Sequence, residues 1–181
     1  MRWTKWQIRR PANRRKLWKD LSGATAIEFA AVGLPFFLLA LATIEVGLAY
    51  FANRMVDNAV VTASRLIRTG QAADGAISQT EFKTQICNSM PDFMCDLDRI
   101  NVEVTSVDSF LNADPTADLY DDDGEVRNPL GFDTGDANSI IVVNVVYEWP
   151  MLASTLGLDP GDAGNTRYLT STMVFRNEPW S

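Results

Sequence analysis

An uncharged apolar run near the amino terminus constrains this 181-residue chain more than any other feature. No residue between Phe29 and Ile44 carries a charge, and the apolar character resumes after Glu45 and continues to Ala52. The 29 residues from Ala24 to Ala52 would extend about 43 Å as a helix at ~1.5 Å per residue, which is enough to cross a bilayer together with its interfaces. We therefore predict a transmembrane helix over residues 24–52.

Basic residues are concentrated ahead of this helix. Eight of the 16 Lys and Arg residues lie in the first 23 positions, whereas the rest of the chain carries 8 basic and 22 acidic residues, a formal net charge of −14. Because basic segments stay on the cytoplasmic side of a membrane, we expect residues 1–23 to form a cytoplasmic leader and residues 53–181 a periplasmic domain. An acidic domain repels polyanions, so no nucleic-acid partner is expected.

Three polar or helix-perturbing residues interrupt or flank the apolar run. Glu28 and Glu45 are 17 residues apart, roughly 25 Å along a helix, so each can lie near one edge of a ~30 Å hydrocarbon layer. Pro35 removes one helical hydrogen bond inside the span. We expect a kink in the transmembrane helix at Pro35.

The amino-terminal third is compatible with three fates. Ala40-Leu41-Ala42 could be the cleavage site of a plain secretory signal, which would leave Thr43 as the new amino terminus, but the apolar helix continues past that bond. An uncleaved membrane anchor explains the hydropathy and leaves the residues just before the span without a role. The third fate is cleavage at the end of the basic leader, between Gly23 and Ala24.

The third fate is suggested by a resemblance to a known family. Gly23 is followed five positions later by Glu28 and then by Phe29, which resembles the motif that type IV prepilin peptidases recognise. The stretch GATAIEFAAVGLPFFLLALATIEVG is similar to the signature of the TadE/TadG-like family, and its matching positions are Glu28-Phe29-Ala30, Pro35, Glu45 and Gly47. The similarity covers about 25 residues.

The resemblance implies a structural role in the Tad (Flp) pilus, a type IV-like system. A prepilin peptidase would cut between Gly23 and Ala24, and Glu28, next to Phe29, would meet the new terminal ammonium of an adjacent subunit during assembly. The outer domain is larger than the short main pilin of that family, so the resemblance favours a minor pseudopilin or assembly component. Its expected partners are the inner membrane, the peptidase, other Tad pilins and membrane platform proteins. The alternative is an uncleaved single-pass protein whose periplasmic domain binds a ligand or secretion partner.

The region after the span predicts an α+β domain. Apolar residues recur at three- and four-residue spacing from Met55 to Ile67, which continues the transmembrane helix as an amphipathic one up to Gly70. Ser78 and Glu81 form a capping box for a helix that ends at about Asn88. Strands are predicted at residues 99–107, 139–149 and 168–176, with a short helix at 150–158 between the last two. We expect the long helix to pack on this small, mostly antiparallel sheet, as in pilins.

The remaining motifs give little indication of chemistry. Cys87 and Cys95 lie in the exported part, which favours a disulfide, and two cysteines without histidine are too few for a zinc site. The acidic loop that contains Asp121 and Asp123 resembles a calcium loop only in part, because Leu119 and Leu130 would occupy ligand positions. Without histidine or a recognisable nucleophile motif, we expect no enzyme activity, no cofactor and no small-molecule substrate.

Overall fold

The long helix α1 spans Ala24–Arg68 and enters both compact units into which the chain divides, Met1–Ala40 and Leu41–Ser181. The computed structural model describes residues 23–72, 77–114, 119–151 and 165–180. Among the residues described in the second unit, the other helices are α2 (Gln79–Asn88) and three short 3₁₀ helices, η4 (Asp92–Met94), η5 (Leu97–Arg99) and η6 (Phe110–Asn112). The predicted continuation of the apolar helix into an amphipathic one is confirmed.

Three antiparallel strands form the sheet in the order β1-β2-β3. Their bounds are Ile100–Val107, Ile140–Pro150 and Thr166–Arg176. Opposite residues include Glu103, Asn144 and Thr172, which form one polar row across all three strands. The predicted strands agree with these bounds to within two residues, and the predicted α+β class with an antiparallel sheet is confirmed.

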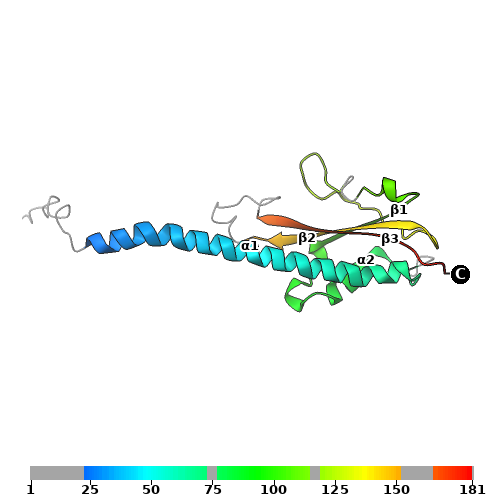
Figure 1. Cartoon of the computed structure of the whole chain (residues 1–181), viewed down its shortest axis with the longest axis horizontal. Coiled ribbons are helices and arrows are strands. Elements are labelled where there is room, and N and C mark those ends of the chain that lie inside the picture. The colour runs from blue at the N-terminus through cyan, green and yellow to red at the C-terminus, as the bar shows by residue number, and fades with distance from the viewer. Residues whose placement is uncertain (1–22, 73–76, 115–118, 152–164, 181) are drawn as a thin grey trace, which may run out of the picture. The chain divides into compact units, whose positions relative to one another are not determined.

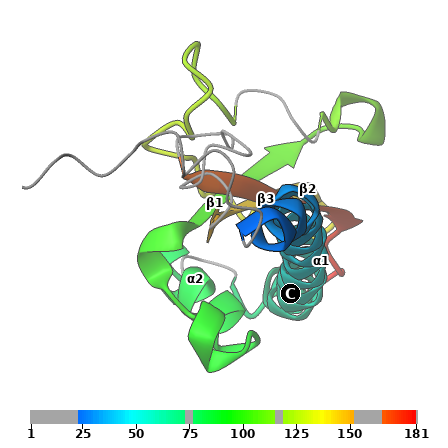
Figure 2. The same cartoon turned by 90° about the vertical axis from the view of Figure 1, so that its left-hand side faces the viewer.

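Helices cover one face of the sheet and a loop covers the other. Viewed along the axis of α1, α1 and α2 lie below the strands and the loop after Leu119 lies above them (Figures 1 and 2). The core lies between the sheet and the helices, where the stripe on α1 that includes Val56, Val60 and Ile67 is fully buried. Burial on α1 already begins at Ala49, because alanine side chains let the rest of the unit approach the helix closely.

The short helix α2 begins at the predicted capping box. The Ser78 hydroxyl accepts from the Glu81 amide at 3.2 Å, and the Glu81 carboxylate accepts from the Ser78 amide at 2.7 Å. The bonds that Glu81 accepts from the Ser78 amide and hydroxyl stabilise the charged carboxylate and lower the pKa of Glu81. The opposite face of α2 buries Phe82 and Ile86 in the core.

The outer edge of β1 is covered by the chain itself. Val104 donates to the Gly131 carbonyl at 2.9 Å and accepts from the Asp133 amide at 2.8 Å. The side-chain amide of Gln79 donates to the Val102 carbonyl at 2.7 Å. These bonds protect the strand from pairing with other chains.

The carboxyl end of α1 is closed by the C-terminal segment. Gly70 has a φ of +77°, and its amide donates to the Ile67 carbonyl at 3.1 Å. The Trp180 ring lies against Gly70, so a Cβ at this position would come within 2.6 Å of Trp180 Cδ2. Glu178 donates its amide to the Arg68 carbonyl at 2.9 Å. The end of the helix therefore depends on a residue without a side chain.

One expectation lies mostly outside the described residues. The short helix predicted at 150–158 starts at Pro150, which is instead the last residue of β2 and pairs with Thr166. The residue after it, Met151, donates to the Asn165 carbonyl at 2.8 Å. The adjacent residues 152–164 are not among those described.

We predict that Gly70→Ala destabilises the second unit. A left-handed backbone costs a non-glycine residue about 1–2 kcal/mol, and the clash with Trp180 adds to that cost. Urea unfolding of the full chain in detergent, followed by tryptophan fluorescence, measures the loss. Gly124→Ala is the matched control, since Gly124 also has a positive φ but an added Cβ there would meet no atom within 4 Å. Equal losses for the two variants would contradict the proposed role of Trp180.

Candidate functional site

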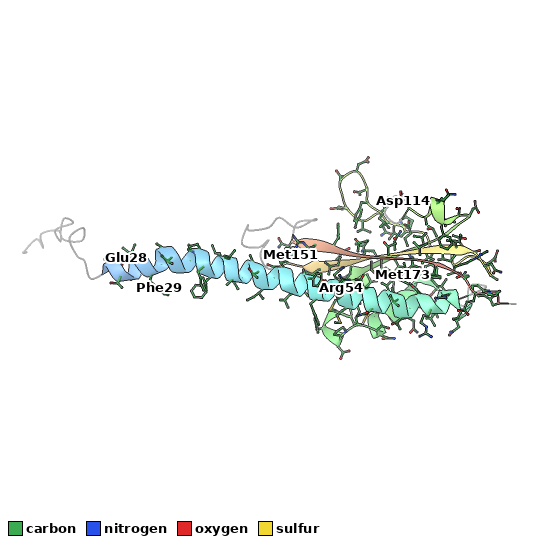
Figure 3. The ribbon with its side chains drawn as sticks, viewed as in Figure 1. Glu28, Phe29, Arg54, Asp114, Met151 and Met173 are labelled. Carbon is green, nitrogen blue, oxygen red and sulfur yellow. A yellow bond between two sulfur atoms is a disulfide. The ribbon has the colours of Figure 1, made fainter. Side chains whose placement is uncertain are left out.

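The predicted processing site lies at the start of α1. Gly23 is exposed and immediately precedes the first helical residue, Ala24, and an added Cβ at Gly23 would meet no atom within 4 Å. Glu28 and Phe29 follow on the first part of the helix, where both are exposed (Figure 3). Residues 1–22, which include nearly all of the predicted leader, are not among those described.

The first turn of α1 contains no acidic residue. Glu28 lies one position beyond that turn, so its carboxylate interacts only weakly with the amides that the helix leaves unpaired at its amino end. Those amides and the helix dipole give this end a partial positive charge. An external carboxylate would therefore be attracted to it.

Large apolar side chains cover the surface of the first half of α1. Among the residues described, α1 is the one helix long and apolar enough to cross a membrane, and its most apolar 18-residue window has no buried residue. Exposed members of this surface include Ile27, Phe29, Val32, Phe36, Phe37 and Leu39. Such a surface is costly in water and suits lipid. It fits a single-pass membrane anchor.

The predicted perturbation at Pro35 falls inside an unbroken helix. α1 continues through Pro35, which cannot donate a hydrogen bond to the carbonyl four residues earlier. Gly33 lies two residues before Pro35, and the Phe29 ring packs over it. A Cβ added at Gly33 would be 3.6 Å from Phe29 Cε1. The expected kink stays a prediction.

Cys87 and Cys95 are joined by a disulfide. It links the end of α2 to the residue after η4, and Cys87 is buried in the core whereas Cys95 is exposed. The same segment is fixed to the sheet by Tyr147, whose buried hydroxyl donates to the Met94 carbonyl at 3.0 Å. Burial raises the pKa of Tyr147, so this hydroxyl keeps its proton at neutral pH.

We predict that Cys87→Ala/Cys95→Ala lowers the free energy of unfolding by about 2–3 kcal/mol, because the disulfide closes a short loop in the unfolded chain. Urea unfolding of the full chain in detergent measures the change. Reduction of the wild-type chain should produce a shift in the same direction. An unchanged midpoint for both the variant and the reduced chain would show that the bond does not contribute to stability.

The acidic loop forms a tight hairpin, which we define as Leu119–Arg127. Tyr120 and Val126 pair as an antiparallel bridge, and the Asp121 carboxylate accepts from the amides of Asp123 and Glu125 at 3.0 and 2.9 Å. Within the described ranges, no three His, Cys, Asp or Glu side chains gather in a way that could hold a metal ion. The Asp121 carboxylate therefore accepts the hydrogen bonds that shape the turn. Among the described residues, Asp123 belongs to no cluster of side chains that could bind a metal ion.

The hairpin is anchored on the face of the sheet away from α1. The Tyr120 hydroxyl lies 3.0 Å from Thr170 Oγ1, and its ring stacks on Tyr168 at 5.6 Å between centroids. The polar row across the strands lies on the same face, where Thr172 Oγ1 donates to the buried Asn144 side chain at 2.8 Å. Arg127 extends from the hairpin to within 3.8 Å of Glu103 in this row.

A groove lies on the other side of the sheet, between α1 and β3. We name it the α1–β3 groove; it has a volume of about 380 Å³ and is lined mainly by Val61, Ser64, Arg65 and Arg68 of α1 and by Met173 and Phe175 of β3. Figure 3 shows Met173 between the sheet and the helix. Its floor is apolar and its rim is basic.

Sequence reasoning did not find the α1–β3 groove or the polar row. The groove joins residues of α1 and β3 that are more than 100 positions apart in the sequence. The polar row joins residues 41 positions apart (Glu103 and Asn144) and 28 positions apart (Asn144 and Thr172), which only the register of the strands brings together. One signal was available for the groove: Ser64 interrupts the apolar stripe of α1, and Arg65 follows it directly. For the polar row, the alternation within β1 predicted that Glu103 lies on the face away from the core. It did not indicate which residues of the neighbouring strands lie beside Glu103.

Comparison with known proteins identifies the amino-terminal part. Residues 23–65 match the model of a family described as TadE-like protein. The match begins at Gly23, ends at Arg65 within α1, and covers under a quarter of the chain. No curated protein and no solved structure matches the chain. The resemblance found in the sequence is confirmed over these residues.

Proposed function

We propose, from the TadE-like identity of residues 23–65, that this Tad pilus-related chain is a minor pseudopilin of the Tad pilus, processed between Gly23 and Ala24. The single observation that carries the proposal is the position of the family match, which starts at the predicted cleavage residue and follows α1. The TadE-like family is a family of pilus components, which also agrees with a structural role.

The accessibility of Gly23 supports processing. A peptidase must bind the chain around the scissile bond in an extended form, and Gly23 lies at the boundary where the α-helix begins. Glycine leaves this position free of a side chain, and it is exposed. The cut would separate the basic leader from an apolar helix that remains in the membrane.

The charge pattern at the start of α1 supports assembly through Glu28. Cleavage would create an α-ammonium group on Ala24, at the helix end that already carries partial positive charge. The first turn has no acidic residue to offset it. A Glu28 carboxylate from an adjacent subunit would do so, and a contact of this kind with a helix end is worth about 0.3–1 kcal/mol at an exposed site and more in a low-dielectric surrounding.

The size of the second unit supports a minor component over the main pilin. The sheet domain and its loops follow a single membrane-spanning helix, and the groove and the acidic hairpin provide surfaces for specific contacts. The same anchor and domain also suit an uncleaved protein that presents a binding domain in the periplasm. The state of the amino terminus distinguishes these two functions.

We predict that the mature protein begins at Ala24, as measured by amino-terminal sequencing of the chain purified from membranes. Gly23→Ala should insert normally and be cleaved more slowly, because a Cβ obstructs the extended substrate. Gly47→Ala is the matched control, since it adds the same methyl group within α1, where no atom lies within 4 Å. A wild-type chain that keeps Met1 would refute processing, and a chain that begins at Thr43 would indicate an ordinary signal peptide.

We predict that Glu28→Ala is still cleaved at Ala24 but yields fewer assembled pili, because the carboxylate that balances the new ammonium is absent. Pili sheared from cells and counted by electron microscopy provide the measurement, with amino-terminal sequencing of the same samples as the check on cleavage. Glu28→Asp keeps the charge and should retain more assembly than Glu28→Ala. Wild-type numbers of pili with Glu28→Ala would show that assembly does not need the Glu28 carboxylate.

A further inference from the structure

The α1–β3 groove presents polar groups that the described residues leave unsatisfied. Ser64 is 2% exposed, and its hydroxyl has no hydrogen-bond partner. The guanidinium of Arg65 forms no ion pair or hydrogen bond within the described ranges. Its neighbour Arg68 is 3.6 Å from Glu178, which is the one acidic residue on the rim. The groove therefore has a free cation beside an unpaired buried hydroxyl.

The basic rim contrasts with the rest of the domain. After residue 23 the chain has 22 acidic and 8 basic residues, yet two arginines and one glutamate line this groove. An anionic occupant with some apolar surface matches it best. The apolar floor, which includes Val61 and Met173, is too open to exclude water without such an occupant.

The hairpin Leu119–Arg127 carries negative charge, which is opposite to the charge on the rim of the groove. Asp122 and Asp123 are exposed at its tip, and their carboxylates have no partner among the residues that the structure describes. The backbone bonds from Asp121 to Glu125 and from Arg127 to Leu119, at 2.9 and 3.0 Å, fix the hairpin before any contact is made. A preformed tip loses little conformational entropy on binding.

The hairpin cannot enter the groove of its own chain. Tyr120 anchors the hairpin on the sheet face that carries Tyr168 and Thr170, whereas Met173 and Phe175 point to the opposite face, toward α1. The sheet separates the two surfaces (Figure 2). Any contact between them has to join two molecules.

We infer that the α1–β3 groove binds the Asp122–Asp123 tip of a second copy of this chain. The tip carboxylates pair with the exposed guanidinium of Arg65 at the rim of the groove. The two surfaces of the contact differ, so each copy retains a free groove or a free hairpin and the contact can continue from subunit to subunit. The inference deepens the proposed function and rests on it, because it names the neighbour that a pilus subunit would contact.

The test is site-specific photocrosslinking in membranes that contain the full chain. A photoreactive phenylalanine at Val61, which is 46% exposed in the groove, should form a covalent adduct with a second copy, and mass spectrometry should locate it in residues 119–127. Arg65→Glu should reduce the adduct about tenfold, as expected when attraction between charges becomes repulsion. Asp122→Lys/Asp123→Lys should reduce it similarly, and the combination of both changes should restore most of the yield.

Two controls make the result specific. Lys83→Glu changes the net charge as Arg65→Glu does but lies on α2, so it should leave the adduct unchanged. The same photoreactive residue at Leu111, which is 96% exposed on η6, should form no adduct that depends on Arg65. The inference is overturned if Val61 crosslinks to a different protein or segment, or if the combined variant fails to recover.

The outcome is separable from that of the proposed function. A chain that begins at Ala24 and assembles into pili, yet gives no adduct between Val61 and the hairpin, would overturn the groove contact alone. A chain that keeps Met1 would overturn the processed-pilin proposal, whichever adducts form.

Discussion

The buried stripe of α1 is the contact on which the rest of the second unit depends. Val56, Val60 and Ile67 are fully enclosed by the sheet and α2, and each such side chain contributes about 1.5–3 kcal/mol when it leaves water. A three-stranded sheet has only marginal stability without a packed face. The same helix, α1, carries both this stripe and the exposed apolar surface that suits lipid.

The sequence alone predicted those elements whose structure depends on one local signal. The period of the apolar residues predicted the course of α1, the pair Ser78 and Glu81 predicted the start of α2, and alternation or apolar runs predicted the strands. What could not be predicted depends on distant pairs. The hairpin meets the sheet through Tyr120 and Thr170, which are 50 residues apart, and no local pattern indicates which strand face receives it.

The two faces of the sheet separate two kinds of interaction. Toward the helices the contacts are apolar and insensitive to salt, whereas the outer face has a row of polar residues and a hairpin with four exposed carboxylates. This division allows the acidic surface to vary in its contacts without disturbing the core. It also explains why charge alone, read from the sequence, predicted repulsion of polyanions but not the basic groove on the helical side.

The family match covers only residues 23–65, so it bears on the general role of the chain and not on its specific one. The match follows α1 from Gly23 to Arg65 and stops before the sheet begins, so the part that resembles the TadE-like family comprises the apolar first half of α1 and most of the stripe that packs on the domain. A helix of this kind fits a single-pass membrane anchor. Under the proposed function, discrimination among partners would come from surfaces that the sheet domain adds, and Arg65 lies both at the end of the family match and in the α1–β3 groove.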